Sequence, residues 1–255
     1  MTPNSEQFKF LTPSNWFSRP VNIVVVGVGG TGSEVLASLA RIDYAIRELG
    51  HQGLKVTAWD GDIVEKPNVG RQAFYPADIG HNKAIVTVQR INYLFGLEWE
   101  AIPKMFDTEN IRLNCDLIIT CVDVAQFRAD LALKMQDNFN KTLWLDAGNG
   151  SHTGQVILGH LGGAGSNGFH LPNVFDFYPD LDGMVDDNTP SCSMEEALVN
   201  QDLPINRTIA NIVMQLVWSL LRHGGLSIQG AYVNIRTGVQ TPINIFNVKA
   251  VGSVN

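Results

Sequence analysis

Residues 21–32 read Val-Asn-Ile-Val-Val-Val-Gly-Val-Gly-Gly-Thr-Gly, and this stretch decides the fold. Its first six residues are mostly β-branched and apolar, which is typical of a parallel strand covered on both faces. The glycines that follow are Gly27, Gly29, Gly30 and Gly32, and residues 33–49 then have the periodicity of a helix. The stretch therefore predicts a strand, a glycine turn and a helix, the unit on which nucleotide-binding sheets are built.

The rest of the first half repeats this alternation of strand and helix. Strands are predicted at 54–59, 97–102, 116–121 and 142–145, and helices at 82–95 and 124–138. Such alternation implies right-handed crossovers and a parallel sheet. Strands are also predicted at 154–160 and 231–247, but without this alternation, and a helix is predicted between them at 205–222. The predicted fold class is therefore α/β, with a Rossmann-like, doubly wound, mostly parallel sheet and an antiparallel extension in the C-terminal half.

The predicted domain organisation is an N-terminal arm, residues 1–20, followed by a single domain, residues 21–255. The arm is polar, with three prolines and several aromatic residues. Within the domain, residues 161–204 form a glycine-rich and acidic loop that contains Cys192. A loop of this length without clear secondary structure usually serves a function or is disordered.

Composition excludes several classes of partner. The net charge is −7 and the sequence pI is about 5.3, which argues against binding to nucleic acid or to an anionic membrane surface. No apolar run predicts a membrane span, and the N-terminus lacks a secretion signal. The three cysteines form no CxxC pair, which fits a reducing cytoplasm and predicts no zinc site. We therefore expect a soluble, cytoplasmic protein.

The glycine turn and the residue that ends the second strand outline a nucleotide site. The N–H groups of the turn and of the helix N-terminus can bind phosphate without a charged side chain. Asp60 is the expected ribose ligand, because a carboxylate can accept hydrogen bonds from both ribose hydroxyls. The turn alone could instead be purely structural, and Asp60 and Asp62 could merely cap a turn. Both interpretations stay open on this evidence.

Four further motifs give a more specific signal. Residues 60–72 read Asp-Gly-Asp-Ile-Val-Glu-Lys-Pro-Asn-Val-Gly-Arg-Gln, and residues 77–83 read Ala-Asp-Ile-Gly-His-Asn-Lys. Residues 121–128 contain Cys-Val-Asp followed by Arg128, and residues 190–193 read Pro-Ser-Cys-Ser. Together these motifs resemble the ThiF/MoeB/HesA family and the adenylation domains of ubiquitin-activating enzymes, over roughly residues 20–222. Within that family the sequence most resembles the ThiF-like protein of bacterial PRTRC systems.

The resemblance implies an adenylyltransferase that binds ATP and Mg²⁺. Arg71 and Lys83 would hold phosphate oxygens, and Asp123 would hold Mg²⁺ beside them. Asn68 and Gln72 would orient the nucleotide by hydrogen bonds. Asp123 could also cap the helix that follows it. The other implied nucleotide contacts are Gly27, Gly29, Gly30, Gly32, Asp60, Asp62 and Val122.

The implied partner is a small ubiquitin-like or sulfur-carrier protein, whose C-terminal carboxylate would receive AMP, and the implied assembly is a homodimer. Cys192 lies in the segment that corresponds to the crossover loop of activating enzymes. It is the candidate nucleophile for a thioester, because a thiolate readily displaces AMP. It could equally be a loop cysteine without a catalytic role, since no adjacent Lys, Arg or His would lower its pKa.

Three features depart from the family. Val124 replaces the asparagine that usually follows the metal carboxylate, and the stretch between Arg71 and Lys83 is one residue shorter. Only Arg19 could be the N-terminal arginine that reaches a neighbouring subunit. Two other functions therefore stay open. An NAD(P)-dependent oxidoreductase would explain the glycines and Asp60 but not the charged residues, and a non-catalytic scaffold of the same family would explain Val124.

Overall fold

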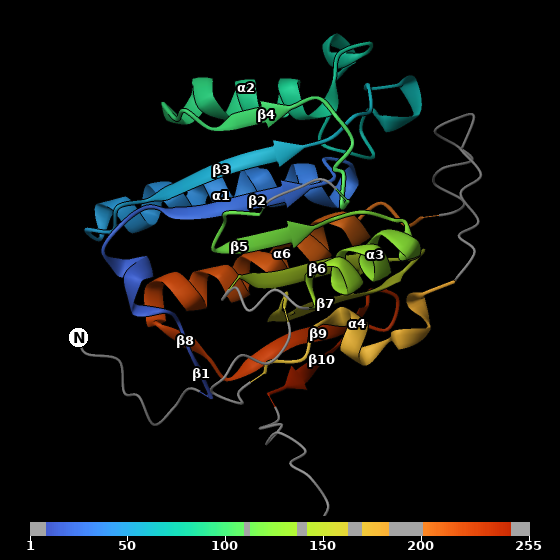
Figure 1. Cartoon of the computed structure of the whole chain (residues 1–255). Helices are drawn as coiled ribbons and strands as arrows, with labels where there is room; N and C mark the ends of the chain where they lie inside the picture. The colour runs from blue at the N-terminus through green and yellow to red at the C-terminus, as the bar shows by residue number, and fades with distance from the viewer. Residues whose placement is uncertain (1–8, 110–112, 137–141, 163–169, 184–200, 246–255) are drawn as a thin grey trace, which may run out of the picture.

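The computed structural model describes residues 9–109, 113–136, 142–162, 170–183 and 201–245. Its main sheet has eight strands in the order β10-β9-β7-β6-β5-β2-β3-β4 (Figure 1). Within this order, all neighbouring strands from β6 to β4 are parallel to each other. The pairs β6–β7, β7–β9 and β9–β10 are antiparallel. A separate antiparallel pair joins β1 to β8. The predicted fold class is confirmed.

The strands have the following bounds: β1 Phe10–Leu11, β2 Val21–Val26, β3 Leu54–Trp59, β4 Glu100–Ile102, β5 Leu117–Thr120, β6 Leu143–Asn149, β7 Thr153–His160, β8 Gly225–Leu226, β9 Ile228–Asn234 and β10 Val239–Asn244. The α-helices are α1 Gly30–Glu48, α2 Lys83–Phe95, α3 Ala125–Met135, α4 Val174–Phe177 and α6 Ile205–Trp218. Short 3₁₀ turns are η2 Ser14–Phe17, η3 Lys66–Asn68, η4 Pro76–Asp78 and η5 Pro179–Leu181, and η6 Ser219–His223 is a π-helical turn.

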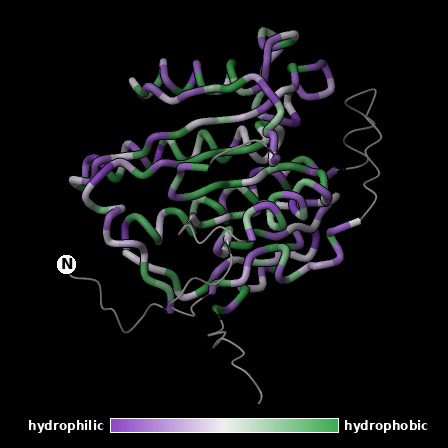
Figure 2. Tube along the Cα trace, viewed as in Figure 1, coloured by the Kyte–Doolittle hydropathy of each residue, from purple (hydrophilic) through white to green (hydrophobic). Residues whose placement is uncertain are grey.

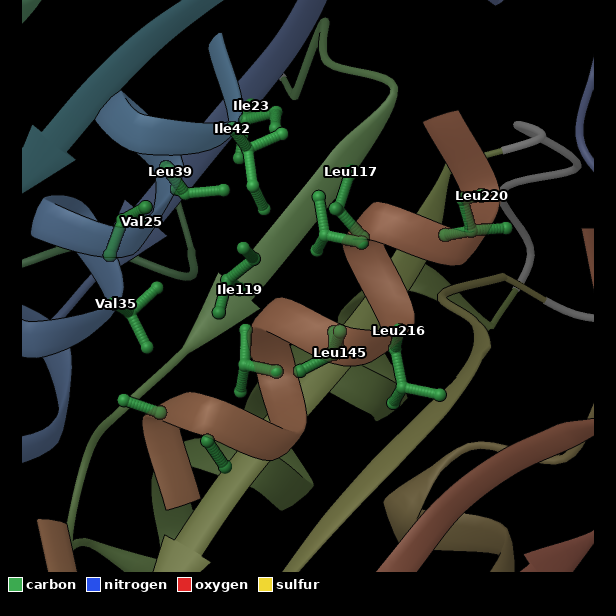
Figure 3. Close-up of a cluster of buried hydrophobic side chains, with 14 of the residues drawn as sticks. Ile23, Val25, Val35, Leu39, Ile42, Leu117, Ile119, Leu145, Leu216 and Leu220 are labelled. Atoms are coloured by element: carbon green, nitrogen blue, oxygen red, sulfur yellow. The ribbon is translucent and has the colours of Figure 1, made fainter. Parts of the chain in front are cut away.

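Two hydrophobic clusters cover the two faces of the sheet. The larger one joins strands β2, β5 and β6 to helices α1 and α6, and Figure 3 shows Leu39, Ile119 and Leu216 meeting there. The smaller one, with Ile118 and Trp144, lies on the opposite face under α3 and α4. Because successive strand residues point to opposite faces, a strand covered on both sides must be apolar throughout. Hydrophobic residues accordingly follow the central strands (Figure 2).

Most predicted elements are confirmed, and the differences lie at their ends. Strands β2 and β3 have the predicted bounds, whereas β6 continues past Leu145 to Asn149. It continues because residues 146–149 pair with β7. Helix α1 begins at Gly30 rather than at residue 33, so the last two glycines of the turn belong to its first turn.

The residues before β2 are packed against the rest of the chain. β1 pairs with β8, and the Thr12 hydroxyl donates to the carbonyl of Leu220 at 2.8 Å. Trp16 is only 2% exposed. The pairing and the hydrogen bond join the described part of the predicted arm to η6 and β8, which follow α6. The boundary predicted at residue 20 stays a prediction.

The described part of the predicted 161–204 loop contains α4 and η5. Asn173 caps α4 by accepting from the N–H groups of Phe175 and Asp176. Residues 163–169 and 184–200, with Cys192, lie outside the described residues. Across the ranges that the structure describes, none of the helices combines the length and apolar character that a membrane crossing requires.

Candidate active site

A cavity of about 480 Å³ opens at the carboxyl ends of β2, β3 and β5, where α1 begins. Ligands of open α/β sheets bind at this edge, because the turns after the strands and the helix N-termini meet there. The predicted site residues that line the cavity are Gly27, Gly29, Gly30, Asp60, Asp62, Arg71, Gln72, Lys83, Val122 and Asp123.

The glycine turn is fixed by close backbone packing. Gly27 has φ +85°, and a Cβ there would lie 2.7 Å from the carbonyl oxygen of Cys121. Gly29 has open space around it. Gly32 is absent from the cavity lining, so its predicted contact with the nucleotide stays a prediction. A Cβ on Gly32 would instead collide with the carbonyl oxygen of Gly27, so this glycine lets α1 approach the strand.

Asp60 holds the glycine turn against the end of β3. Its buried carboxylate accepts from the N–H of Val28 at 2.6 Å and from the N–H of Asp62 at 2.8 Å. Burial raises the pKa of Asp60, and these two hydrogen bonds oppose the shift. Because each oxygen has a second lone pair, the carboxylate can still accept from a ligand hydroxyl in the cavity.

Lys83 reaches the cavity although the stretch before it is one residue shorter than in the family pattern. Its ammonium lies 3.0 Å from the carboxylate of Asp62 and is mostly buried. Asn82 holds this region together: its side-chain amide donates to the carbonyls of Asp60 and Asp62, and its oxygen caps α2. The sequence analysis missed the positioning role of Asn82, which its place as the helix N-cap could have indicated.

Arg71 lies in the same cavity, facing Asp123. Burial lowers the pKa of its guanidinium, and the charge of Asp123 opposes that shift. Nη1 of Arg71 donates to Oε1 of Gln201 at 2.8 Å. Its Nε and the Oε1 of Gln72 are buried and have no hydrogen-bond partner within the described ranges. Buried polar atoms without partners are rare, and these two lie in the lining of a cavity where a ligand could satisfy them.

Asn68 is absent from the cavity lining, and its predicted contact with the nucleotide stays a prediction. Its side-chain oxygen accepts from the N–H of Glu65 at 2.8 Å, and its carbonyl accepts from the N–H of Gln72. Both hydrogen bonds shape the turn η3. Through its carbonyl, Asn68 also positions Gln72, which lines the cavity.

Asp123 lies at the end of β5 and faces the cavity. The N-cap of α3 is Val124, so the alternative in which Asp123 occupies the N-cap position is wrong. Val124 itself lines the cavity, so the departure from the family replaces an amide by an apolar group inside the site. Arg128, one turn further, is ion-paired with the buried Asp146 at 2.9 Å.

One end of the cavity is apolar and aromatic. The rings of Trp59 and Phe106 meet edge to face at 5.4 Å, and Phe106 meets Phe127 in the same way at 6.0 Å. All three residues line the cavity. Trp59 directly precedes Asp60 in the chain, and Phe106 belongs to the smaller hydrophobic cluster, against which Trp59 and Phe127 pack. The cavity thus has an apolar end suited to a planar ring and a polar end that contains Arg71 and Gln201.

A second cavity, of about 550 Å³, adjoins the first, and Asp123 lines both. Its floor is the antiparallel extension, with Gly150 and Gly154 among the lining residues. Tyr178 and Tyr232 meet over it with their hydroxyls 2.8 Å apart. The two cavities together offer room for a nucleotide and for a second reactant that approaches it near Asp123.

Of the remaining residues, Arg19 and Cys115 lie outside the lining of this cavity, whereas Cys121 is part of it. Arg19 forms a two-pronged ion pair with Asp116, before the start of β5, and so lies at the end of the sheet away from the cavity. Burial raises the pKa of the Cys115 thiol to about 12 and that of Cys121 further still. In the described part of the chain, His, Cys, Asp and Glu side chains form no group of three that could hold a metal ion.

A family model described as the ThiF family matches residues 18–249. The chain belongs to the ThiF family. This membership explains why the motifs after β3 and β5 converge on one cavity, and it confirms the resemblance found in the sequence.

One ThiF-related protein is the ubiquitin-like modifier-activating enzyme 5 of Caenorhabditis elegans, 29% identical over 158 residues. The match covers 56% of this chain and 34% of that protein, so the chain spans about a third of its relative.

Solved structures of similar fold include E. coli MccB with ATP, with a TM-score of 0.61, 16% identity and coverage of 91% of this chain and 67% of that one. PaaA has a TM-score of 0.61 and 16% identity, covering 89% and 65%. MccB with MccA has a TM-score of 0.64 and 16% identity, covering 91% and 66%. At these identities the likeness shows the shared fold.

Proposed function

We propose that this protein uses ATP and Mg²⁺ to adenylate the C-terminal carboxylate of a small ubiquitin-like or sulfur-carrier protein and releases pyrophosphate. The observation that carries the proposal is the convergence of Arg71, Lys83 and Asp123 on one cavity beside the glycine turn. Family membership supports it, as do the relative that activates a ubiquitin-like modifier and the fold shared with MccB bound to ATP.

The two ends of the cavity assign an orientation to the nucleotide. The base fits the aromatic end, because stacking on Trp59, Phe106 or Phe127 suits a planar ring. Asp60 lies next along the chain, where it can accept from the ribose hydroxyls. The triphosphate then extends over the glycine turn toward Arg71 and Lys83, whose positive charges balance its negative charge.

Asp123 is the residue that would hold Mg²⁺. The fit rests on its carboxylate, which lies in the cavity facing Arg71, since Mg²⁺ sites commonly use one or two carboxylates together with substrate phosphates. When bound, the ion would neutralise charge on the phosphates and on the departing pyrophosphate.

The second cavity supports a route for the acceptor. An extended protein tail lying over β7 and β9 would bring its terminal carboxylate to Asp123, where the two cavities meet. A carboxylate oxygen attacks the α-phosphorus, the bond from that phosphorus to the bridging oxygen of pyrophosphate breaks, and an acyl adenylate forms. No proton has to move in this step, so the protein only aligns the two anions and offsets their repulsion.

Cys192 belongs to the proposal as an optional later step. Its thiolate would attack the acyl carbon of the adenylate, expel AMP and leave a thioester. The homodimer, the cytoplasmic location and the role of Cys192 stay predictions.

Calorimetry with ATP and Mg²⁺ tests the nucleotide site. We expect Arg71→Ala and Lys83→Ala to weaken ATP binding by roughly tenfold or more each, because each loses a charged contact to phosphate. Lys66→Ala is the matched control, because Lys66 is exposed and absent from the cavity lining. Tighter binding of NAD than of ATP would favour the oxidoreductase and contradict the proposal.

Exchange of labelled pyrophosphate into ATP tests the reaction. It should require a candidate partner with a free C-terminal carboxylate and fail with the same partner amidated at its C-terminus. Two observations favour a non-catalytic scaffold: Val124 lies in the cavity, and Arg19 is ion-paired with Asp116 away from it. ATP binding without exchange for any such partner would support that alternative.

A further inference from the structure

A chain of neutral side chains links the glycine turn to Arg71. The Thr31 hydroxyl, in the first turn of α1, lies 3.1 Å from Oδ1 of Asn206 and 3.0 Å from Oδ1 of Asn149, and it can donate its one proton to either oxygen. Nδ2 of Asn206 donates to Oε1 of Gln201 at 3.1 Å, and the same oxygen accepts from Nη1 of Arg71 at 2.8 Å. All four residues line the nucleotide cavity, although they come from three distant parts of the sequence.

Asn206 is seated tightly in this arrangement. It is 5% exposed, and its oxygen also lies 3.4 Å from Nδ2 of Asn149 at the end of β6. A Cβ on Gly30 would collide with its side-chain amide. Gly30 therefore makes room for Asn206, and the position of Asn206 is fixed relative to the backbone that would hold phosphate.

Gln201 holds one edge of the guanidinium without neutralising its charge. A carboxylate in the same place would pair with Arg71 and compete with phosphate, whereas an amide oxygen only orients it. Because the guanidinium is planar, fixing Nη1 also fixes the direction of its other donors. The Nε among them is buried without a partner in the described ranges.

We infer that Gln201 and Asn206 are positioning residues, which set the distance and angle between Arg71 and the glycine turn so that the triphosphate meets both at once. The inference rests on the proposed function for the identity of the anion. Such preorganisation improves binding because the arginine loses little freedom when the ligand arrives. No contact between either amide and the nucleotide is required.

A double-mutant cycle tests this coupling by calorimetry with ATP and Mg²⁺. We expect Gln201→Met to weaken ATP binding by roughly tenfold while the affinity for adenosine stays unchanged, since only the phosphate contact is disturbed. In an Arg71→Ala background the same substitution should change ATP affinity less than about twofold. Gln201→Glu should weaken binding more than Gln201→Met, because it adds a negative charge. Asn211→Ala is the control, because Asn211 is exposed and lies on α6, the helix that carries Asn206.

An equal loss in both backgrounds would overturn the inference, because Gln201 would then act independently of Arg71. A second measurement does not depend on ATP. In protein labelled with ¹⁵N-arginine, rotation of the Arg71 guanidinium should be slow in the wild type and fast in Gln201→Met and Asn206→Ala. Unchanged rotation would contradict the inference, whereas failure of the wild type to bind ATP would contradict the proposed function.

Discussion

At the scale of single residues, the glycines of the turn differ in what they do. A Cβ on Gly32 would collide with the backbone carbonyl of Gly27, whereas a Cβ on Gly29 would meet nothing within 4 Å. We expect Gly32→Ala to lower the free energy of unfolding by about 1–3 kcal/mol, because α1 must move away from the strand. Urea unfolding followed by circular dichroism measures this change.

Gly150→Ala is the matched control. Gly150 is exposed after β6, is not among the glycines with positive φ, and a Cβ there would come no closer than 3.9 Å to the atoms around it. This substitution should cost less than about 1 kcal/mol. Equal effects of the two substitutions would mean that the close approach at Gly32 does not limit packing.

At the scale of elements, an ion pair fastens α3 to the sheet. Nε of Arg128 lies 2.9 Å from Asp146 of β6, which is fully buried and also accepts from the Thr120 hydroxyl. We expect Arg128→Met to lower the free energy of unfolding by about 3–5 kcal/mol, because a buried carboxylate loses its cation. Thermal and urea unfolding both measure this loss of stability.

A surface ion pair on the same helix, α3, provides the matched comparison for Arg128→Met. Lys134 pairs with Glu109 at the surface, with the carboxylate side chain 72% exposed. Lys134→Met should therefore change stability by less than about 1 kcal/mol. Adding Asp146→Leu to Arg128→Met should recover stability, since no uncompensated charge is then buried. Without such recovery, the loss would come from packing of the Arg128 side chain.

At the scale of the whole molecule, His160 joins three separate regions. It ends β7, its ring meets Phe10 of β1 edge to face at 6.0 Å, and its Nδ1 accepts from the N–H of Leu171 at 2.8 Å. Burial, with a smaller effect from the neighbouring His170, lowers the pKa of His160 from 6.5 to about 4. The folded protein therefore keeps this ring neutral under mildly acidic conditions.

The protein should consequently become less stable as the pH is lowered. Between pH 6.5 and about 4 the unfolded chain binds a proton at His160 that the folded protein does not, so the free energy of unfolding falls as the pH is lowered. His160→Gln should flatten this slope in urea unfolding at pH 7.5, 6 and 5. Some slope will remain, because burial also lowers the pKa of His51. An unchanged slope would refute the assignment.

Local sequence patterns predicted most of the elements correctly, and they singled out residues that line one cavity, for identifiable reasons. The β-branched run of β2 and the following glycines are signals that neighbouring residues give by themselves. The end of β6 was missed, because residues 146–149 are strand only through pairing with β7. The motif position of Asn68 did not reveal that its side-chain oxygen accepts a hydrogen bond within its own turn.

The sequence by itself determined the order of strands and helices, the glycine turn and the motifs that carry Arg71, Lys83 and Asp123. These features depend on backbone preferences and on apolar periodicity, which are local. Only the tertiary structure decided that the three charged residues share one cavity and that Gln201 and Asn206 link Arg71 to the turn. Contacts across more than a hundred residues depend on how α6 packs against α1, and no neighbouring residue encodes that.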